Sequence, residues 1–159
     1  MRAELEDRIA RLEAKDAIRA LKARYAAACD SGFDLGLLGE LFTEDAIFDA
    51  GAFGRFSGRR AILDYYATMP ATITWGLHYV AGPRISVGDD GQTATGAWYF
   101  LQPATMNDRA VWVMGTYHDE YRRDGGEWRF SRVELSVEAV TPFESGWVRE
   151  RFLAPPDES

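Results

Sequence analysis

The first third of the chain carries apolar residues at helical spacing. They fall into two stripes, Leu5, Ile9 and Leu12, then Ile18, Leu21, Tyr25 and Ala28. The phase slips near Lys15-Asp16, so we predict a short helix, a kink or break, and a second helix. Ser31-Gly32 ends the second helix, because glycine readily adopts the left-handed conformation beyond a helix C-terminus.

Shorter elements follow. Asp34 has the position of an N-cap for a short helix running through Leu38 to Phe42. The stretch FTEDAIFDA predicts a first strand. Ser57-Gly58 opens another helix, from about Arg59 to Met69, which Pro70 ends.

From Ile73 onward the alternation of apolar and polar residues predicts strands. The expected strands are Thr72–Val80, Arg84–Val87, Thr93–Leu101, Ala110–Arg122 and Glu127–Val137. Gly82-Pro83 predicts a bulge or bend between the first two, while Asp89-Asp90-Gly91 and Asp124-Gly125-Gly126 predict hairpin turns. Helices followed by an antiparallel meander are typical of an α+β fold. If the sheet curls, its inward side chains line a pocket.

The composition is typical of one soluble domain. We expect residues 1–153 to form that domain and residues 154–159 to be a disordered tail. The formal net charge of −7 argues against a nucleic-acid partner. No run approaches the ~20 apolar residues of a membrane helix, and the charged N-terminus shows no secretory signal. The single cysteine, Cys29, favours a reducing compartment, so we expect a cytoplasmic protein without a membrane partner.

Candidate chemistry centres on two histidines, since imidazole is the side chain best suited to proton transfer near neutral pH. His78 and His118 both lie in predicted strands. His118 shares a strand face with Thr116 and Glu120, which indicates a solvated outer face. Asp30 is a candidate partner for His78, yet helical spacing turns Asp30 toward solvent. His78 is therefore either a catalytic base or an ordinary polar strand residue.

The sequence gives no sign of a metal or nucleotide cofactor. Two histidines and scattered acids lack the close spacing of a metal site. Glycine-rich phosphate-binding motifs and the G-x-S-x-G elbow are absent. We expect no cofactor and no metal.

Several motifs resemble the SnoaL-like branch of the NTF2-like superfamily. They are DAIRALKARYAAACDSGFD, LGELFTEDAIFDA, SGRRAILDYY, LHYVAG and GTYHDEYRRDGGEWRFSR, spread over nearly the whole chain. The resemblance implies a cone-shaped α+β barrel, with N-terminal helices packed on a curved mixed, mostly antiparallel sheet. This fold hosts many chemistries as well as inert binders.

Within the branch, the chain is similar to the dehydratases and to the hexachlorocyclohexane dehydrochlorinase. There, an aspartate at the end of the first long helix orients a strand histidine that removes a proton, and Asp30 and His78 match those positions. The dehydrochlorinase has lysine at the position of Tyr25, and its arginine aligns near Val133, with Arg132 the nearest substitute. Both departures count against halide elimination.

Tyr25 instead matches the bile-acid 7α-dehydratase type, in which a tyrosine accompanies the same aspartate and histidine. Those dehydratases add an acid on a middle strand, where this chain has Leu101 and Gln102. Scytalone dehydratases have a second pocket histidine there, and Trp98–Leu101 offers none. The resemblance therefore implies a Tyr25-Asp30-His78 triad without defining a substrate.

The expected function is a cofactor-independent lyase that eliminates water from a hydrophobic cyclic or polycyclic substrate. An isomerase, cyclase or hydrolase on the same pocket, and a non-catalytic ligand-binding protein, are the alternatives. Candidate substrate-binding residues are Tyr65, Trp75, Trp98, Phe100, Trp112, Met114 and Arg132. The family resemblance implies a homo-oligomer, a trimer or a dimer, packed through the open face of the sheet, and the aromatic content of 13% is compatible with this.

Overall fold

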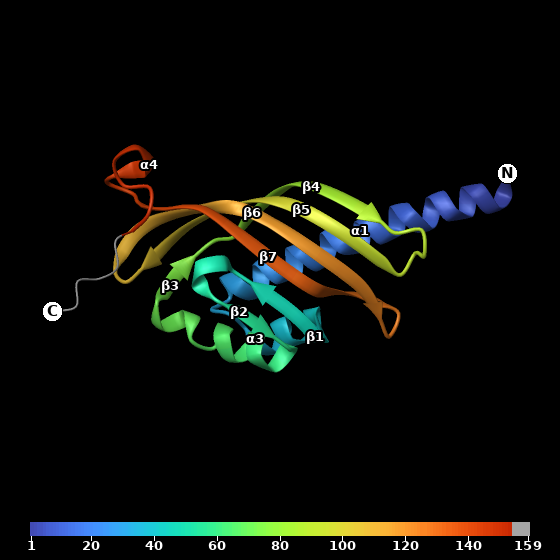
Figure 1. The fold of residues 1–159 in the computed structure, drawn as a ribbon, viewed down its shortest axis with the longest axis horizontal. Helices are drawn as coiled ribbons and strands as arrows, with labels where there is room; N and C mark the ends of the chain where they lie inside the picture. The colour runs from blue at the N-terminus through green and yellow to red at the C-terminus, as the bar shows by residue number, and fades with distance from the viewer. Residues whose placement is uncertain (154–159) are drawn as a thin grey trace.

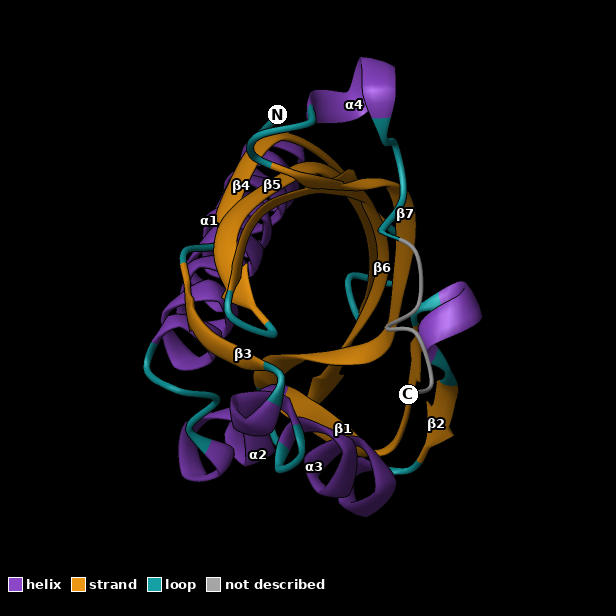
Figure 2. Ribbon diagram, turned by 90° about the vertical axis from the view of Figure 1, so that its left-hand side faces the viewer, coloured by secondary structure: helices purple, strands orange, loops and turns teal. Residues whose placement is uncertain are grey.

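A strongly curved sheet of seven strands dominates the structure, a computed structural model that describes residues 1–153. The strand order is β2-β1-β7-β6-β5-β3, and β4 also pairs with β5. All strand pairs are antiparallel except β1 with β7, so the sheet is mixed. Viewed end-on, the sheet is strongly curved, and helices α2 and α3 lie below it (Figure 2). This arrangement confirms the expected α+β fold, with N-terminal helices packed on a curved, mixed, mostly antiparallel sheet.

The elements follow one another in the order predicted. Their bounds are α1 Arg2–Asp30, α2 Leu35–Leu41, β1 Phe42–Asp49, a 3-10 turn Gly51–Phe53, β2 Arg55–Ser57, α3 Arg59–Tyr66, a second 3-10 turn Met69–Ala71, β3 Ile73–Gly76, β4 Tyr79–Val87, β5 Thr93–Met106, β6 Arg109–Asp124, β7 Glu127–Pro142 and α4 Gly146–Arg149. The predicted tail, 154–159, lies outside the described residues.

The first helix is one continuous element, so the predicted break near Lys15-Asp16 is wrong. Its N-terminal turns extend beyond the sheet (Figure 1), where Leu5 and Leu12 are 55% and 66% exposed. The second apolar stripe packs into the core, with Ile18 fully buried. The phase slip therefore marks where the helix begins to contact the fold, and it does not interrupt the backbone hydrogen bonds.

Local capping signals agree with the structure more closely. The Asp34 carboxylate accepts a hydrogen bond from the backbone N–H of Leu37 at 3.0 Å, which confirms the predicted N-cap of α2. Gly32 has φ of 74°, the left-handed conformation expected beyond α1. Helix α3 ends at Tyr66, earlier than predicted, because the chain tightens into the 3-10 turn that contains Pro70.

The predicted strand Thr72–Val80 is interrupted. β3 ends at Gly76 and β4 begins at Tyr79, and both pair with β5, so Leu77 and His78 form a two-residue junction between them. His78 is thus beside the sheet rather than within a strand. The predicted bulge at Gly82-Pro83 is present as a register shift inside a continuous β4.

Candidate active site

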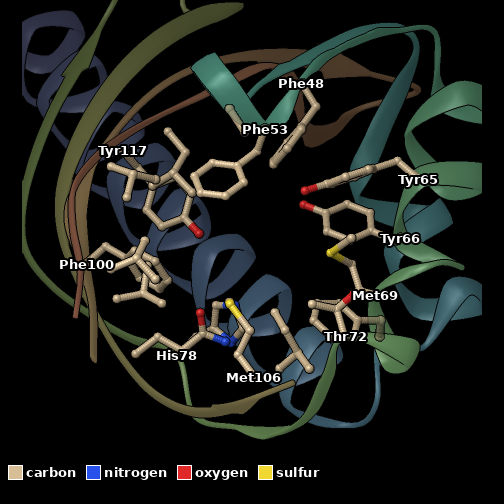
Figure 3. Close-up of a pocket in the computed structure, with 18 of the residues that line it drawn as sticks. Phe48, Phe53, Tyr65, Tyr66, Met69, Thr72, His78, Phe100, Met106 and Tyr117 are labelled. Atoms are coloured by element: carbon tan, nitrogen blue, oxygen red, sulfur yellow. The ribbon is translucent and has the colours of Figure 1, made fainter. Parts of the chain in front are cut away.

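A largely apolar cavity lies between the concave face of the sheet and helices α1 and α3 (Figure 3). It comprises about 780 Å³ of empty space, including its open mouth. Its walls come from almost every element: Tyr25, Phe33, Phe48, Ala50, Phe53, Tyr65, Tyr66, Met69, Thr72, Ile73, His78, Phe100, Gln102, Met106, Val113, Tyr117, Leu135, Val137 and Val140. Its largely apolar walls suit a small hydrophobic molecule.

Asp30 and His78 meet at one edge of this cavity. The Asp30 carboxylate oxygen Oδ1 lies 2.7 Å from His78 Nδ1 and accepts a second hydrogen bond, at 2.8 Å, from the His78 backbone N–H. The histidine side chain is only 7% exposed and that of Asp30 is 25% exposed. Because an ionised carboxylate accepts hydrogen bonds, Nδ1 carries the proton, which leaves the Nε2 lone pair available as a base.

The helical pattern predicted that Asp30 faces solvent, but in the structure its carboxylate binds His78. The strand junction runs past the end of α1, where the His78 N–H has no sheet partner and donates to the carboxylate instead. An acid in the last helical turn costs about 0.3–1 kcal/mol. Hydrogen bonds to a charged group contribute about 1.5–3 kcal/mol each, so two of them offset that cost.

Three phenols that line the same cavity as His78 form a hydrogen-bonded cluster. The hydroxyl oxygen of Tyr25 lies 2.8 Å from that of Tyr66 and 3.5 Å from that of Tyr117. The hydroxyls of Tyr65, Tyr66 and Tyr117 point into the cavity, as does the imidazole of His78 (Figure 3). Burial raises the pKa of Tyr25, Tyr66 and Tyr117 well above the ordinary value. These phenols therefore stay neutral and act as hydrogen-bond donors.

Cys29, next to Asp30 in the chain, is buried and free. Burial raises the pKa of its thiol to about 12. A thiol with that pKa is protonated near neutral pH and is a poor nucleophile.

Sequence reasoning missed an ion pair behind the phenols. Lys22 and Asp119 are both fully buried, with the ammonium 2.8 Å from the carboxylate and 3.4 Å from the ring centroid of Tyr117. Asp119 also accepts a hydrogen bond from the Tyr121 hydroxyl, which itself accepts one from the Trp98 indole N–H. Asp119 shares a face of β6 with Tyr117, two residues away, but no local signal pairs it with a lysine so distant in sequence.

Only two of the predicted substrate-binding residues, Tyr65 and Phe100, line the cavity. Trp98 points inward but is held in the network behind the phenols. Trp112 and Met114 alternate with the cavity-lining Val113, so they face the opposite side of β6. These three assignments to the cavity wall are wrong for reasons of packing and parity.

Trp75 and Arg132 also lie elsewhere. Trp75 is 53% exposed and borders a smaller groove on the Asp30 side of His78. Arg132 pairs with Glu134 at 2.8 Å on the outer face of β7, while its neighbour Val133 is fully buried. Neither side chain lines the cavity, so Arg132 does not place a cation there. His118 is exposed, in agreement with its predicted outer face.

Residues 1–153 show neither a cluster of metal ligands nor a membrane-spanning helix. No group of three or more histidine, cysteine, aspartate or glutamate side chains within that range is arranged to hold a metal ion. In the same range, no helix combines the length and apolarity needed to span a membrane.

Comparison with known proteins identifies a family and several solved structures of similar fold. Residues 10–134 match the SnoaL-like domain family. No curated protein matches the chain. A hexachlorocyclohexane dehydrochlorinase from Novosphingobium barchaimii LL02 superimposes with a TM-score of 0.79 at 21% identity, covering 93% of this chain and 99% of that one.

Two solved structures from Novosphingobium aromaticivorans are also similar. A protein provisionally described as an aromatic ring hydroxylase has a TM-score of 0.75 and 28% identity, over 82% of this chain and 94% of that chain. Another, provisionally described as a scytalone dehydratase, has a TM-score of 0.77 and 20% identity, over 84% and 90% of the two chains. These likenesses establish the fold.

Proposed function

The chain belongs to the SnoaL-like domain family within the NTF2-like superfamily, and from this premise we propose that it is a cofactor-independent lyase. Its reaction is the elimination of water from a hydrophobic cyclic or polycyclic compound. The observation that carries the proposal is the 2.7 Å contact between Asp30 Oδ1 and His78 Nδ1 at the edge of an apolar cavity. The dehydratase and dehydrochlorinase named among the similar structures are consistent with an elimination.

His78 is the general base in this reaction. Its Nε2 takes a proton from a carbon next to a carbonyl group, and the electron pair of the C–H bond moves onto the carbonyl oxygen as an enolate. Asp30 holds the imidazole in one tautomer and stabilises the imidazolium that forms. The return of the electron pair makes a C=C bond and breaks the C–O bond of the hydroxyl one carbon further on.

A neutral phenol of the Tyr25 cluster assists the departing hydroxyl. It donates a proton, so water leaves, and the proton on the imidazolium returns to the phenolate through solvent. The raised pKa of these phenols keeps them protonated, so a donor is present when the hydroxyl departs. General acid–base assistance of this kind contributes about 10²–10⁴ in rate.

The proposal is tested with hydroxylated cyclic ketones, beginning with the β-hydroxy derivative of α-tetralone. Formation of the dehydrated product is followed by absorbance and mass spectrometry. We expect turnover by the native protein and its loss in His78→Ala. Ligand binding without conversion would favour the non-catalytic alternative. Deuterium uptake from heavy water without loss of the hydroxyl would favour an isomerase.

Assembly and location remain predictions. The side chains of Trp75, Tyr79 and Tyr99 are more than half exposed, which is compatible with a homo-oligomer, either trimer or dimer. Light scattering of the purified protein measures the number of subunits. The cytoplasmic location rests on the single Cys29 of the sequence and is checked by cell fractionation.

A further inference from the structure

Gln102 lies beside His78 on the inner face of the sheet. β3 and β4 pair with β5 on either side of the junction formed by Leu77 and His78. In this register the junction lies across from Pro103 and Gln102, and the Leu77 N–H donates to the Pro103 carbonyl at 3.2 Å. Alternation along β5 turns Gln102 inward, and both Gln102 and His78 border the cavity.

The amide nitrogen of Gln102 is buried and has no hydrogen-bond partner in the part of the chain that the structure describes. The residue is 4% exposed, and its Nε2 makes no hydrogen bond to residues 1–153. Buried polar groups in native proteins are nearly always paired, since an unpaired one is unfavourable for folding. Gln102 borders the cavity, and rotation of the amide about its terminal bond exchanges the positions of nitrogen and oxygen, so this unpaired donor is a candidate for a hydrogen bond to a ligand.

Gly76 on β3 makes room for this amide. A Cβ atom at Gly76 would lie 2.8 Å from Gln102 Nε2, closer than real Cβ contacts. The φ angle of Gly76 is outside the left-handed region, so its backbone conformation does not itself require glycine. Glycine at this position leaves the space that the amide occupies.

We propose that Gln102 is a ligand-binding residue that donates a hydrogen bond to a carbonyl oxygen, so that the site selects cyclic ketones over hydrocarbons of the same shape. One part of this inference rests on the proposed function, namely that the bound oxygen takes up negative charge during the reaction. The bound oxygen is the one that becomes negative when His78 removes the neighbouring proton, and a donor beside the base is well placed to stabilise it. The phenol cluster is then left for the departing hydroxyl.

Binding of a matched ligand pair tests this role. α-Tetralone is a bicyclic ketone, and tetralin is the hydrocarbon with the same two rings. We expect the native protein to bind α-tetralone about three- to tenfold more tightly than tetralin, the range of one neutral hydrogen bond. Gln102→Leu should remove this preference and retain the affinity for tetralin, as measured by calorimetry.

Two further variants separate the amide from general packing. Gly76→Ala crowds the amide and should reduce the ketone preference without removing a polar group. Gln92→Leu makes the same chemical change at an exposed position and should leave the preference unchanged. Gln102→Leu should keep or raise the melting temperature, because it replaces an unpaired buried amide with an apolar side chain of similar size. A fall in the melting temperature would therefore reveal a loss of binding that is caused by unfolding.

Proton exchange distinguishes failure of this inference from failure of the proposed function. The native protein in heavy water should accelerate deuterium uptake next to the carbonyl of α-tetralone, followed by NMR. Gln102→Leu should slow this exchange, whereas His78→Ala should abolish it and keep the ketone preference. A Gln102-dependent preference without exchange would refute the base and leave the binding role intact. Absence of the preference in the native protein, or its persistence in Gln102→Leu, would overturn the role of Gln102.

Discussion

Asp30 binds His78 through two hydrogen bonds that end on the same carboxylate oxygen, one from the imidazole and one from the backbone. The carboxylate therefore fixes both the ring and the strand junction that carries it. This contact links the C-terminal end of α1 to the junction between β3 and β4.

Replacement of either member of this pair should reduce turnover of a hydroxylated ketone. We expect His78→Ala to lower kcat by about 10²–10⁴, the usual contribution of a general base. Asp30→Asn should also lower kcat, because an amide cannot stabilise the imidazolium as a carboxylate does. His118→Ala, at an exposed position, is the matched control. Circular dichroism checks that the fold persists, and full activity in both His78→Ala and Asp30→Asn would contradict the assignment.

Removal of one phenol hydroxyl should affect stability and turnover together. Tyr66→Phe deletes the 2.8 Å hydrogen bond to Tyr25 and should cost about 0.5–1.5 kcal/mol in the free energy of unfolding. It should also lower kcat more than it raises KM, because the donor acts on the departing group. Tyr99→Phe, at an exposed position, should change neither quantity. Unchanged kcat in Tyr25→Phe, Tyr66→Phe and Tyr117→Phe would exclude the phenol cluster as the acid.

The buried ion pair should behave as a unit in a double-mutant cycle. Lys22→Met leaves the Asp119 carboxylate buried without its cation and should cost about 3–5 kcal/mol in unfolding free energy. The double variant Lys22→Met/Asp119→Leu should recover much of that loss, since no uncompensated charge remains. Urea denaturation measures the four free energies. Strictly additive effects would show that the two charges do not stabilise one another.

Cys29 should make the protein less stable in mild alkali. Burial raises the pKa of the folded thiol to about 12, whereas the unfolded thiol titrates near about 8.5. Above about pH 8.5 the unfolded chain loses a proton that the folded chain keeps, so the free energy of unfolding falls as pH rises toward 12. Between about pH 8.5 and 10, Cys29→Ala should show a shallower decline in urea denaturation. An equal slope in both proteins would mean that the thiol is not the cause.

Signals local in sequence predicted local structure well. Asp34 caps α2 and Gly32 ends α1, because caps and turns depend on a few adjacent residues. The antiparallel meander of β5 to β7 followed from the alternation and the hairpin signals, and the curvature of the sheet followed from the family resemblance. The extent of α1 did not, since helix phase alone cannot tell a break from a helix that projects beyond its sheet.

The site itself depends on contacts between distant segments. Helical spacing directed Asp30 to solvent, and only the family resemblance brought it to His78, 48 residues away. Tyr66 and Gln102 carried no distinguishing pattern, because an aromatic in a helix and an amide in a strand are ordinary there. Strand parity would have excluded Trp112 and Met114 had the inner face of β6 been known. Their true positions required the register with β5.

Because His78 lies in the two-residue junction between β3 and β4, its backbone N–H reports on the contact with Asp30. The N–H of His78 is bound by a side-chain carboxylate, whereas its neighbours in β3 and β4 belong to the sheet. Its hydrogen exchange therefore follows opening of the Asp30 contact rather than unfolding of the sheet. The NMR resonance of this amide would thus measure how often the His78 N–H is released from Asp30, in the intact protein and without any substrate.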